Sequence, residues 1–302
     1  MQLAFIGLGK MGLPMSMNAV RAGHDIYGFD LDRAVCATAK KQGVKIAPNL
    51  QELIKQLSAP RVIWLMLPNG KAVEEAIFGK GGLITILKKE DTIIDGGNSN
   101  WRVSANRAQR VNEVGLRWLD MGVSGGTVAA ERGYAMMAGG DRTAFRQVEP
   151  LIKDLTQVGG YGYFGNAGAG HFIKMVHNSI EYGMMEAIAE GFNLLKNGPV
   201  GKIDAEKVAR VWNHGTIVES FLMEMAQQAL VKDANLNNLK GYVEDTGEGK
   251  WAVEEAVNHA IPYTVNTEAV YARFSSRDNG DFANKLLAAM RNKFGGHAFR
   301  KK

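Results

Sequence analysis

The sequence has almost no cysteine, since Cys36 is the single one among 302 residues. One cysteine cannot form an intramolecular disulfide, which excludes a disulfide-stapled secreted fold and fits a reducing cytoplasm. Long apolar runs are lacking too, because the longest, VIWLML before Pro68, is far too short to cross a bilayer. The chain opens on QLAFIGLG without the basic segment and cleavage site of a secretory signal. We therefore expect a cytoplasmic protein with no membrane partner.

Clusters of His, Cys, Asp and Glu with metal-ligand spacing are also missing, so no metal site is predicted. Charge is only modestly unbalanced, since 36 Lys and Arg against 31 Asp and Glu give +5. The excess lies in residues 273–302, where eight Lys or Arg against two Asp give +6. A basic tail suits nucleic acid or a small anionic ligand. The tail has no regular basic run, so a small anionic ligand is as reasonable a partner as nucleic acid.

The first half of the chain alternates short apolar stretches with helical ones. Strands are predicted in LAFIGL, DIYGFD, RVIWLML, TIIDGG and RWLDMGV, and further strands near 134–137 and 161–164. Near-continuous apolar strands separated by helices are typical of a parallel sheet covered on both faces. After Gly168 the strand pattern ends, and helices are predicted over 169–196, 204–214, 216–230, 235–244, 248–259, 262–276 and 279–292. The predicted fold is an α/β, Rossmann-like, doubly wound domain (1–166) followed by an all-α domain (167–302).

A glycine-rich stretch follows the first predicted strand and opens the first helix. It matches G-x-G-x-x-G, in which the glycines permit a tight turn, a close pyrophosphate and close helix packing. The N-terminus of the helix then binds the anion. A structural turn is the alternative, but the strand–helix context favours a dinucleotide. We predict dinucleotide contacts from all six residues of the motif, Gly7, Leu8, Gly9, Lys10, Met11 and Gly12.

An acidic residue, Asp30, ends the second predicted strand, eighteen residues past the glycine motif. An acid at this place accepts hydrogen bonds from the adenosine ribose and repels a 2′-phosphate. Leu31 follows where an NADP enzyme would place an arginine, although Arg33 is close by. We predict NAD rather than NADP, with Leu67 and Pro68 bordering the nucleotide at the carboxyl end of RVIWLML.

Four polar residues share one stripe of the long helix predicted over 169–196. Their offsets are 0, +3, +4 and +7, which place them within a sector of about 100°. They are Lys174, His177, Asn178 and Glu181. A helix stripe normally holds apolar residues facing a core. A potential base and a potential acid in that position indicate a polar cleft, and a surface salt-bridge face is the alternative.

Two loops follow other predicted strands, at the edge where a nicotinamide would project. Asn98 lies in DGGNSN, and Ser124, Gly125 and Gly126 lie in GVSGG. Bare backbone amides and a serine hydroxyl can hold a carboxylate. Each loop taken alone is equally compatible with an ordinary turn.

Several stretches of the chain together resemble the decarboxylating 6-phosphogluconate dehydrogenases, within the β-hydroxyacid dehydrogenase superfamily. They are GLGKMGLPM, DGGNSN, GVSGG, MAGG, GAGHFIKMVHNSIEYG, GEGKW, YARFSS and RNKFGGH, and they span essentially the whole sequence. The KMVHNSIEYG stretch and the FGGH tail are the most specific to this branch. The resemblance implies oxidative decarboxylation of 6-phospho-D-gluconate to ribulose 5-phosphate and CO₂, with reduction of NAD.

The resemblance also implies residue roles. Lys174 would take the proton of the C3 hydroxyl, and Glu181 would protonate C1 of the enediol after CO₂ leaves. Substrate hydroxyls and carboxylate would be bound by Asn98 (also beside the cofactor), Ser124, Gly125, Gly126, His177 and Asn178. The phosphate would be bound by Tyr182, Lys250, Arg273, Arg291 and His297. The resemblance therefore implies a small-molecule partner for the chain and no nucleic acid.

The resemblance extends to assembly and chain length. In the family the C-terminal arginine and histidine reach a neighbouring subunit, so a homodimer or homotetramer is expected. Longer members duplicate the helical domain, and this chain carries one copy, as short NAD-preferring members do. Thr127, Val128 and Ala129 also stand where long forms often have acidic residues.

Two other functions remain compatible with the sequence. An NAD-dependent dehydrogenase of another β-hydroxy acid, of the 3-hydroxyisobutyrate type, would share the glycine motif and Lys174. It would not decarboxylate, and it would need neither Glu181 nor the basic tail. A dinucleotide-binding sensor or nucleic-acid-binding module would need neither Lys174 nor Glu181.

Overall fold

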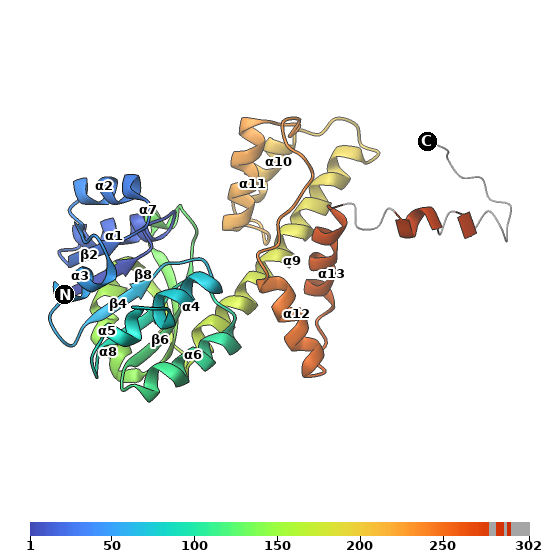
Figure 1. The fold of residues 1–302 in the computed structure, drawn as a ribbon. Coiled ribbons are helices and arrows are strands. Elements are labelled where there is room, and N and C mark those ends of the chain that lie inside the picture. The colour runs from blue at the N-terminus through green and yellow to red at the C-terminus, as the bar shows by residue number, and fades with distance from the viewer. Residues whose placement is uncertain (278–281, 287–288, 291–302) are drawn as a thin grey trace. The chain divides into compact units, whose positions relative to one another are not determined.

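The computed structural model describes residues 1–277, 282–286 and 289–290. The chain forms two compact units, the N-terminal unit Met1–Met175 and the helical unit Val176–Lys302 (Figure 1). The predicted domain boundary lies between residues 166 and 167, just before the long helix α9 (Ala169–Asn197). The two compact units instead divide within α9, between Met175 and Val176. None of the helices in the described part of the chain has the length and hydropathy needed to cross a bilayer.

The N-terminal unit is built around one eight-stranded sheet, in the order β3-β2-β1-β4-β5-β6-β7-β8. The strands are β1 Gln2–Ile6, β2 Asp25–Phe29, β3 Lys45–Ile46, β4 Val62–Leu65, β5 Thr92–Asp95, β6 Arg117–Ser124, β7 Tyr134–Gly140 and β8 Thr156–Tyr163. Neighbouring strands from β3 to β6 pair parallel, β7 pairs antiparallel to β6, and β8 pairs parallel to β7. The chain moves outward from β1 to β3 and then returns to β4. The carboxyl ends of β1 and β4 therefore form the switch point at which such sheets bind ligands.

Helices cover both faces of this sheet. They are α1 Gly12–Arg21, α2 Arg33–Lys41, α3 Leu50–Lys55, α4 Lys71–Phe78, α5 Leu83–Ile86, α6 Trp101–Glu113, α7 Ala129–Arg132 and α8 Arg142–Leu155. Along β1, Leu3 and Phe5 belong to one buried cluster, and Ala4 and Ile6 belong to another. Successive strand residues point to opposite faces, so each face has its own apolar core. The predicted α/β doubly wound fold is confirmed, although the sequence did not indicate β3, α5, α7 or α8.

The helical unit contains most of α9 Ala169–Asn197, together with α10 Ala205–Trp212, α11 Phe221–Lys232, α12 Glu248–Asn258 and α13 Thr264–Ser275. Helices α10 and α11 pack as one pair, and α12 and α13 as another. No strand occurs after β8 in the described residues, so the all-α prediction for this region is confirmed there.

Two helix predictions in this unit are wrong. Residues 235–244 form turns, because the Asp233 carboxylate accepts the N–H groups of Asn235 and Asn238 at 3.2 and 3.3 Å, and Leu236 has a φ of +53°. Such side-chain bonds compete with helix formation. The helix predicted from 216 begins at Phe221 instead, where Ser220 caps it. Half of the helix predicted over 279–292 lies outside the described residues, and its described parts, 282–286 and 289–290, are helical.

Candidate active site

The glycine motif needs glycine for a different reason at each of its three positions. Gly7 has a φ of +90°, and an added Cβ there would lie 2.4 Å from the Met66 carbonyl oxygen. A Cβ at Gly12 would lie 2.0 Å from the Gly7 carbonyl oxygen, so α1 packs this close only with glycine. At Gly9 an added Cβ would meet no described atom within 4 Å. The open backbone at Gly9 and the N-terminus of α1 together fit the pyrophosphate of a dinucleotide.

The other residues of the motif lie in different surroundings. The Leu8 side chain is fully buried in the core, Lys10 is exposed, and Met11 is partly buried. Leu8 can reach a ligand only through its backbone, and its N–H donates to Asp30 Oδ2 at 2.6 Å. The other oxygen, Asp30 Oδ1, accepts the N–H of Asp32 at 2.8 Å. Two backbone donors thus fix the Asp30 carboxylate just past β2, and it keeps lone pairs for ribose hydroxyls.

The loops after β4 and β5 form a connected edge with the end of β6. Leu67 is partly buried and Pro68 is exposed in the first loop. An added Cβ at Gly97, in the second loop, would lie 2.4 Å from the Leu67 carbonyl oxygen, so the two loops are in close contact. Asn98 has a φ of +51°, and its side chain exchanges two hydrogen bonds with the Val123 backbone, at 3.3 and 3.2 Å. Asn98 therefore ties the β5 loop to the end of β6.

Lys174 and the end of β6 lie together in the structure. The Lys174 side chain comes from α9 and is buried, and its Nζ donates to Ser124 Oγ at 2.9 Å. An added Cβ at Gly122 would lie 2.5 Å from the Lys174 Cβ, so glycine allows α9 to approach β6. Gly125 and Gly126 follow with φ values of +108° and +58°. An amine, a hydroxyl and a glycine turn thus meet at the carboxyl end of β6.

The remaining members of the predicted polar stripe lie on the same continuous helix, α9, but belong to the helical unit. His177 Nδ1 is 3.0 Å from Asn178 Oδ1 and 4.0 Å from Glu181 Oε2. The side chains of His177 and Glu181 are 41% and 40% exposed. These three polar groups are accessible to a ligand, unlike the buried Lys174.

Two residues of the predicted phosphate set contact each other. The Arg273 guanidinium carbon lies 3.5 Å from the centre of the Tyr182 ring, and both side chains are buried. Arg273 Nη1 donates to the Glu244 carbonyl oxygen at 2.8 Å, and the Tyr182 hydroxyl lies 3.3 Å from Thr246 Oγ1. A guanidinium stacked on an aromatic ring loses little freedom when it binds an anion.

The other residues of that set are placed differently. Lys250 is exposed and lines a groove of about 390 Å³ between α12 and α13, beside Tyr271 and Phe274. The last two residues of the set, Arg291 and His297, lie outside the described residues. Within the described residues, no group of three or more His, Cys, Asp or Glu could hold a metal ion.

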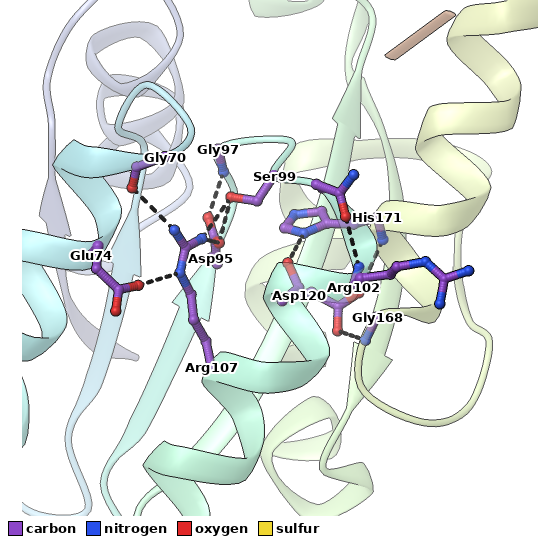
Figure 2. Close-up of polar contacts among 12 residues, drawn as sticks. Gly70, Glu74, Asp95, Gly97, Ser99, Arg102, Arg107, Asp120, Gly168 and His171 are labelled. Carbon is purple, nitrogen blue, oxygen red and sulfur yellow. Dashed lines mark hydrogen bonds and ion pairs between the residues drawn. The ribbon is translucent and has the colours of Figure 1, made fainter. Parts of the chain in front are cut away.

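A buried arginine that the motifs did not single out lies beneath the β5 loop (Figure 2). Arg107 Nη1 donates to Asp95 Oδ2 at 3.2 Å and to Ser99 Oγ at 3.0 Å. The buried positions of α6 are Ser104, Arg107, Ala108 and Val111, which form an i, i+3, i+4, i+7 stripe. A charged residue on such a stripe is the signal by which the sequence could have revealed this cluster.

A second buried cluster holds the start of α9 (Figure 2). The Asp120 carboxylate, from β6, accepts the N–H of Gly168 at 2.7 Å and that of His171 at 3.0 Å. His171 Nδ1 in turn lies 2.6 Å from Ser104 Oγ on α6. Asp120 therefore caps α9 one turn before Lys174 and fixes the helix against the strand that carries Ser124.

Models of one family match nearly the whole chain. The NAD binding domain of 6-phosphogluconate dehydrogenase matches residues 2–165, and the 6-phosphogluconate dehydrogenase C-terminal domain matches residues 170–281. A Bacillus subtilis (strain 168) protein provisionally named 6-phosphogluconate dehydrogenase is 42% identical over 302 residues, which are 100% of both chains. The NAD(+)-dependent, decarboxylating 6-phosphogluconate dehydrogenase of Haloferax volcanii is 35% identical over 304 residues, covering 100% of this chain and 99% of that protein.

A solved structure agrees with these matches. Plasmodium falciparum 6-phosphogluconate dehydrogenase, described with NADP⁺ and with 6-phosphogluconate, aligns with a TM-score of 0.82 at 30% identity. The alignment covers 100% of this chain and 66% of that one, so this chain is markedly shorter. The glycine motif, the Lys174–Ser124 pair and the matched family models lead to one conclusion: this chain belongs to the 6-phosphogluconate dehydrogenase family, with a nicotinamide-dinucleotide-binding domain at its N-terminus.

Proposed function

We propose that the protein oxidatively decarboxylates 6-phospho-D-gluconate to ribulose 5-phosphate and CO₂ and reduces NAD. The observation that carries the proposal is the buried Lys174 amine, held 2.9 Å from Ser124 at the edge that Asn98 also borders. Glu181 follows two turns later on the same helix. A base for the oxidation and an acid for the later protonation are thus both present on α9.

The chemistry divides into two proton transfers. When bound, the nicotinamide accepts a hydride from C3 of the substrate. Lys174 takes the proton of the C3 hydroxyl at Nζ, which requires a neutral amine when the substrate binds. The product is a β-keto acid, whose C3 oxygen accepts a hydrogen bond from the protonated Lys174 as the bond to the carboxylate carbon breaks. Glu181 then donates a proton to the enediolate carbon that had carried the carboxylate, which leaves a ketone at the former C3.

We propose NAD as the cofactor of this enzyme. Backbone N–H groups hold the Asp30 carboxylate at the place where the 2′-phosphate of NADP would lie. The negative charge of Asp30 would repel that phosphate. Leu31, beside it, is 89% exposed and supplies no cation. Arg33 is the nearest cation along the chain and lies in the first turn of α2. A lower kcat/KM with NAD than with NADP would overturn this assignment.

We propose that the substrate phosphate is bound by Tyr182, Lys250 and Arg273 together with Arg291 and His297. A phosphate of about two negative charges needs several cations. Arg273, stacked on Tyr182 and bonded to a backbone carbonyl, is already held in one position. Substitution of Arg273 should therefore raise KM for the phosphorylated acid more than it lowers kcat.

A homodimer or homotetramer is part of the same proposal, with Arg291 and His297 acting on a neighbouring subunit's site. The helical unit leaves large apolar side chains exposed, including Ile217 at 103%, Val257 at 74% and Val265 at 74%. Exposed apolar surface of this kind is typical of subunit contacts. A monomer with full activity on size-exclusion chromatography would contradict the proposal.

The test is a comparison of two substrates on the purified protein, with NADH formation and CO₂ release followed in parallel. We expect 6-phosphogluconate to yield both products and 3-hydroxyisobutyrate to yield neither at a comparable rate. Turnover of 3-hydroxyisobutyrate without turnover of 6-phosphogluconate would reject the proposal. That result would favour a non-decarboxylating β-hydroxyacid dehydrogenase.

A further inference from the structure

Arg107 is an unusual residue for its position, because its side chain is only 2% exposed on a helix whose other buried residues are Ser104, Ala108 and Val111. A buried charge is costly unless it is paired and hydrogen-bonded. A helix that needed only to cover the sheet would carry an apolar residue there. The contacts that Arg107 makes therefore point to what it does.

The guanidinium of Arg107 bonds to two different loops (Figure 2). Nη2 donates to the Gly70 carbonyl oxygen at 3.0 Å, in the loop between β4 and α4. Nη1 donates to Asp95 Oδ2 at 3.2 Å and to Ser99 Oγ at 3.0 Å, at the end of β5 and in the loop that follows. Nε donates to Glu74 Oε2 at 3.1 Å, in the first turn of α4. One planar group thus joins the segments that follow two neighbouring strands.

Further hydrogen bonds make the β5 loop a rigid turn. Ser99 Oγ donates to Asp95 Oδ2 at 2.8 Å, and Asp95 Oδ1 accepts the N–H of Gly97 at 3.0 Å. Between them lies Asn98, in the left-handed conformation that Asn adopts more readily than most side chains. The surrounding bonds fix the backbone here, and the Asn98 side chain bonds to Val123.

Both joined loops carry residues proposed for the cofactor site. The loop after β4 contains Leu67 and Pro68, and the loop after β5 contains Asn98. Neither loop belongs to the glycine motif, which bonds instead to the β2 end through Leu8 and Asp30. None of the hydrogen bonds that Arg107 makes in the described part of the chain reaches the glycine motif, although Gly7 packs against Met66 at the start of the β4 loop. We therefore expect Arg107 to affect the nicotinamide half of the site more than the adenosine half.

We propose that Arg107 is a positioning residue, which fixes the loops after β4 and β5 so that Asn98, Leu67 and Pro68 hold the nicotinamide against the substrate. It acts through these loops and does not itself touch cofactor or substrate. The proposal rests on the proposed function for the identity of the substrate, but its cofactor-binding part holds for any oxidised acid. A lysine cannot replace Arg107, because a single ammonium cannot make four bonds in these fixed directions.

The matched control is Arg110, one turn further along the same helix. Arg110 bonds to the other oxygen of Glu74, but its side chain is 40% exposed and it joins no loop of the site. Arg107→Lys and Arg110→Lys therefore make the same chemical change on one helix. The difference between them isolates the contacts to Gly70, Asp95 and Ser99.

The experiment measures dissociation constants for NADH and for ADP-ribose, together with kcat for 6-phosphogluconate. ADP-ribose occupies the adenosine half and carries no nicotinamide. For Arg107→Lys we expect the NADH dissociation constant to rise roughly tenfold and kcat to fall about 10- to 100-fold. The ADP-ribose constant should stay within about twofold, and Arg110→Lys should match wild type in all three.

An equal weakening of NADH and ADP-ribose in Arg107→Lys would overturn the proposal, because it would mean that the arginine supports the whole domain. Wild-type values in Arg107→Lys would overturn it as well. If Arg107→Lys does not fold, the Ser99→Ala variant tests the proposal in its place. It removes one of the four bonds, and should weaken NADH alone by roughly twofold to fivefold, whereas no change would reject the proposal. If wild-type protein does not oxidise 6-phosphogluconate, the proposed function fails, while the two binding constants still test Arg107.

Discussion

The two units of the molecule differ in how they place the charged and polar groups proposed for the site. The N-terminal unit buries charged side chains, including Asp95, Arg107 and Asp120, and pairs each of them with partners inside the unit. The helical unit leaves its polar groups on α9, His177 and Glu181, about two-fifths exposed. The proposed site groups of the N-terminal unit are therefore held in fixed positions before any ligand binds. Those of the helical unit are partly exposed on α9, while Arg273 is buried against Tyr182.

This difference matches the two halves of the proposed reaction. Hydride transfer needs the nicotinamide, the C3 hydroxyl and the base in fixed geometry, and small displacements there are expensive. The proposal assigns the glycine motif, Asn98, Ser124 and Lys174 of the N-terminal unit to that step. The later steps need cations that bind the substrate phosphate and an acid that donates a proton, and the proposal assigns both to the helical unit. Glu181, which is partly exposed, can deliver its proton once the substrate has bound.

The largest expected effect tests the buried half of this comparison. Lys174→Met should lower kcat by about 10²- to 10⁴-fold, because a positioned general base contributes that much. NADH binding should be unaffected, since the glycine motif does not involve Lys174. Lys153→Met, at an exposed position on α8, is the control and should behave as wild type. A kcat within threefold or so of wild type for Lys174→Met would show that another group takes the proton.

The accessible half is tested by Glu181→Gln, which should lower kcat by about 10²-fold or more because the enediol loses its proton donor. Hydride transfer does not need that donor. A single-turnover burst of NADH should therefore survive in the variant while steady-state turnover falls. Glu190→Gln, at an exposed position further along α9, serves as the control. Loss of the burst together with turnover would mean that Glu181 also acts in the oxidation.

Cofactor choice should depend on one carboxylate of the N-terminal unit. Asp30→Ala should lower the ratio of kcat/KM for NAD to that for NADP by roughly tenfold, because ribose hydroxyls lose an acceptor and a 2′-phosphate loses a repelling charge. Asp32→Ala removes a helix-capping carboxylate close by, which contacts Ala34 and Val35 rather than the glycine motif. That control should leave the ratio unchanged. An unchanged ratio in Asp30→Ala would mean that other residues determine the preference for NAD over NADP.

The smallest effect concerns stability in acid. Burial raises the pKa of the Glu74 carboxyl, but hydrogen bonds from Arg110 and Arg107 outweigh burial and hold that pKa below its ordinary value. A lowered pKa in the folded state contributes stability above the unfolded value of 4.5, and this stability is lost as pH falls through the folded pKa. The Glu74 side chain is 40% exposed, so solvent screens the effect.

Thermal unfolding at several pH values measures this contribution. Between about pH 7 and about pH 4, Tm of wild type should fall slightly more than Tm of Glu74→Gln, which carries no carboxyl to protonate. Glu75→Gln, which loses only an exposed pair with Lys71, should follow wild type. Parallel curves for wild type and Glu74→Gln would mean that the carboxylate contributes nothing to folding.

The sequence predicted those parts of the site that depend on short segments. The glycine motif and Asp30 could be found because a strand, a turn and a helix in immediate succession specify their geometry. Lys174 could be found because helical spacing places it on a polar stripe. By contrast, Arg107 bonds to Gly70, 37 residues away, and Asp120 caps a helix that starts near Gly168, 48 residues away. No local pattern specifies such partners.

The failed prediction of a helix over 235–244 has a local origin. The segment contains three Asn and a Gly, which are poor helix formers, and turn bonds from Asp233 prevail over the helical spacing of Leu236, Leu239 and Val243. The catalytic and binding roles of all the candidate site residues, on α9 as elsewhere, stay predictions from the sequence and the family. The proposed base and the proposed acid lie in different units.

The most direct test of the account follows the carboxylate carbon itself. With 6-phosphogluconate labelled at C1, labelled CO₂ and NADH should form in equal amounts, and both should be lost together in Lys174→Met. NADH formed without labelled CO₂ would contradict the central claim that one α9 helix serves an oxidation and a decarboxylation in succession.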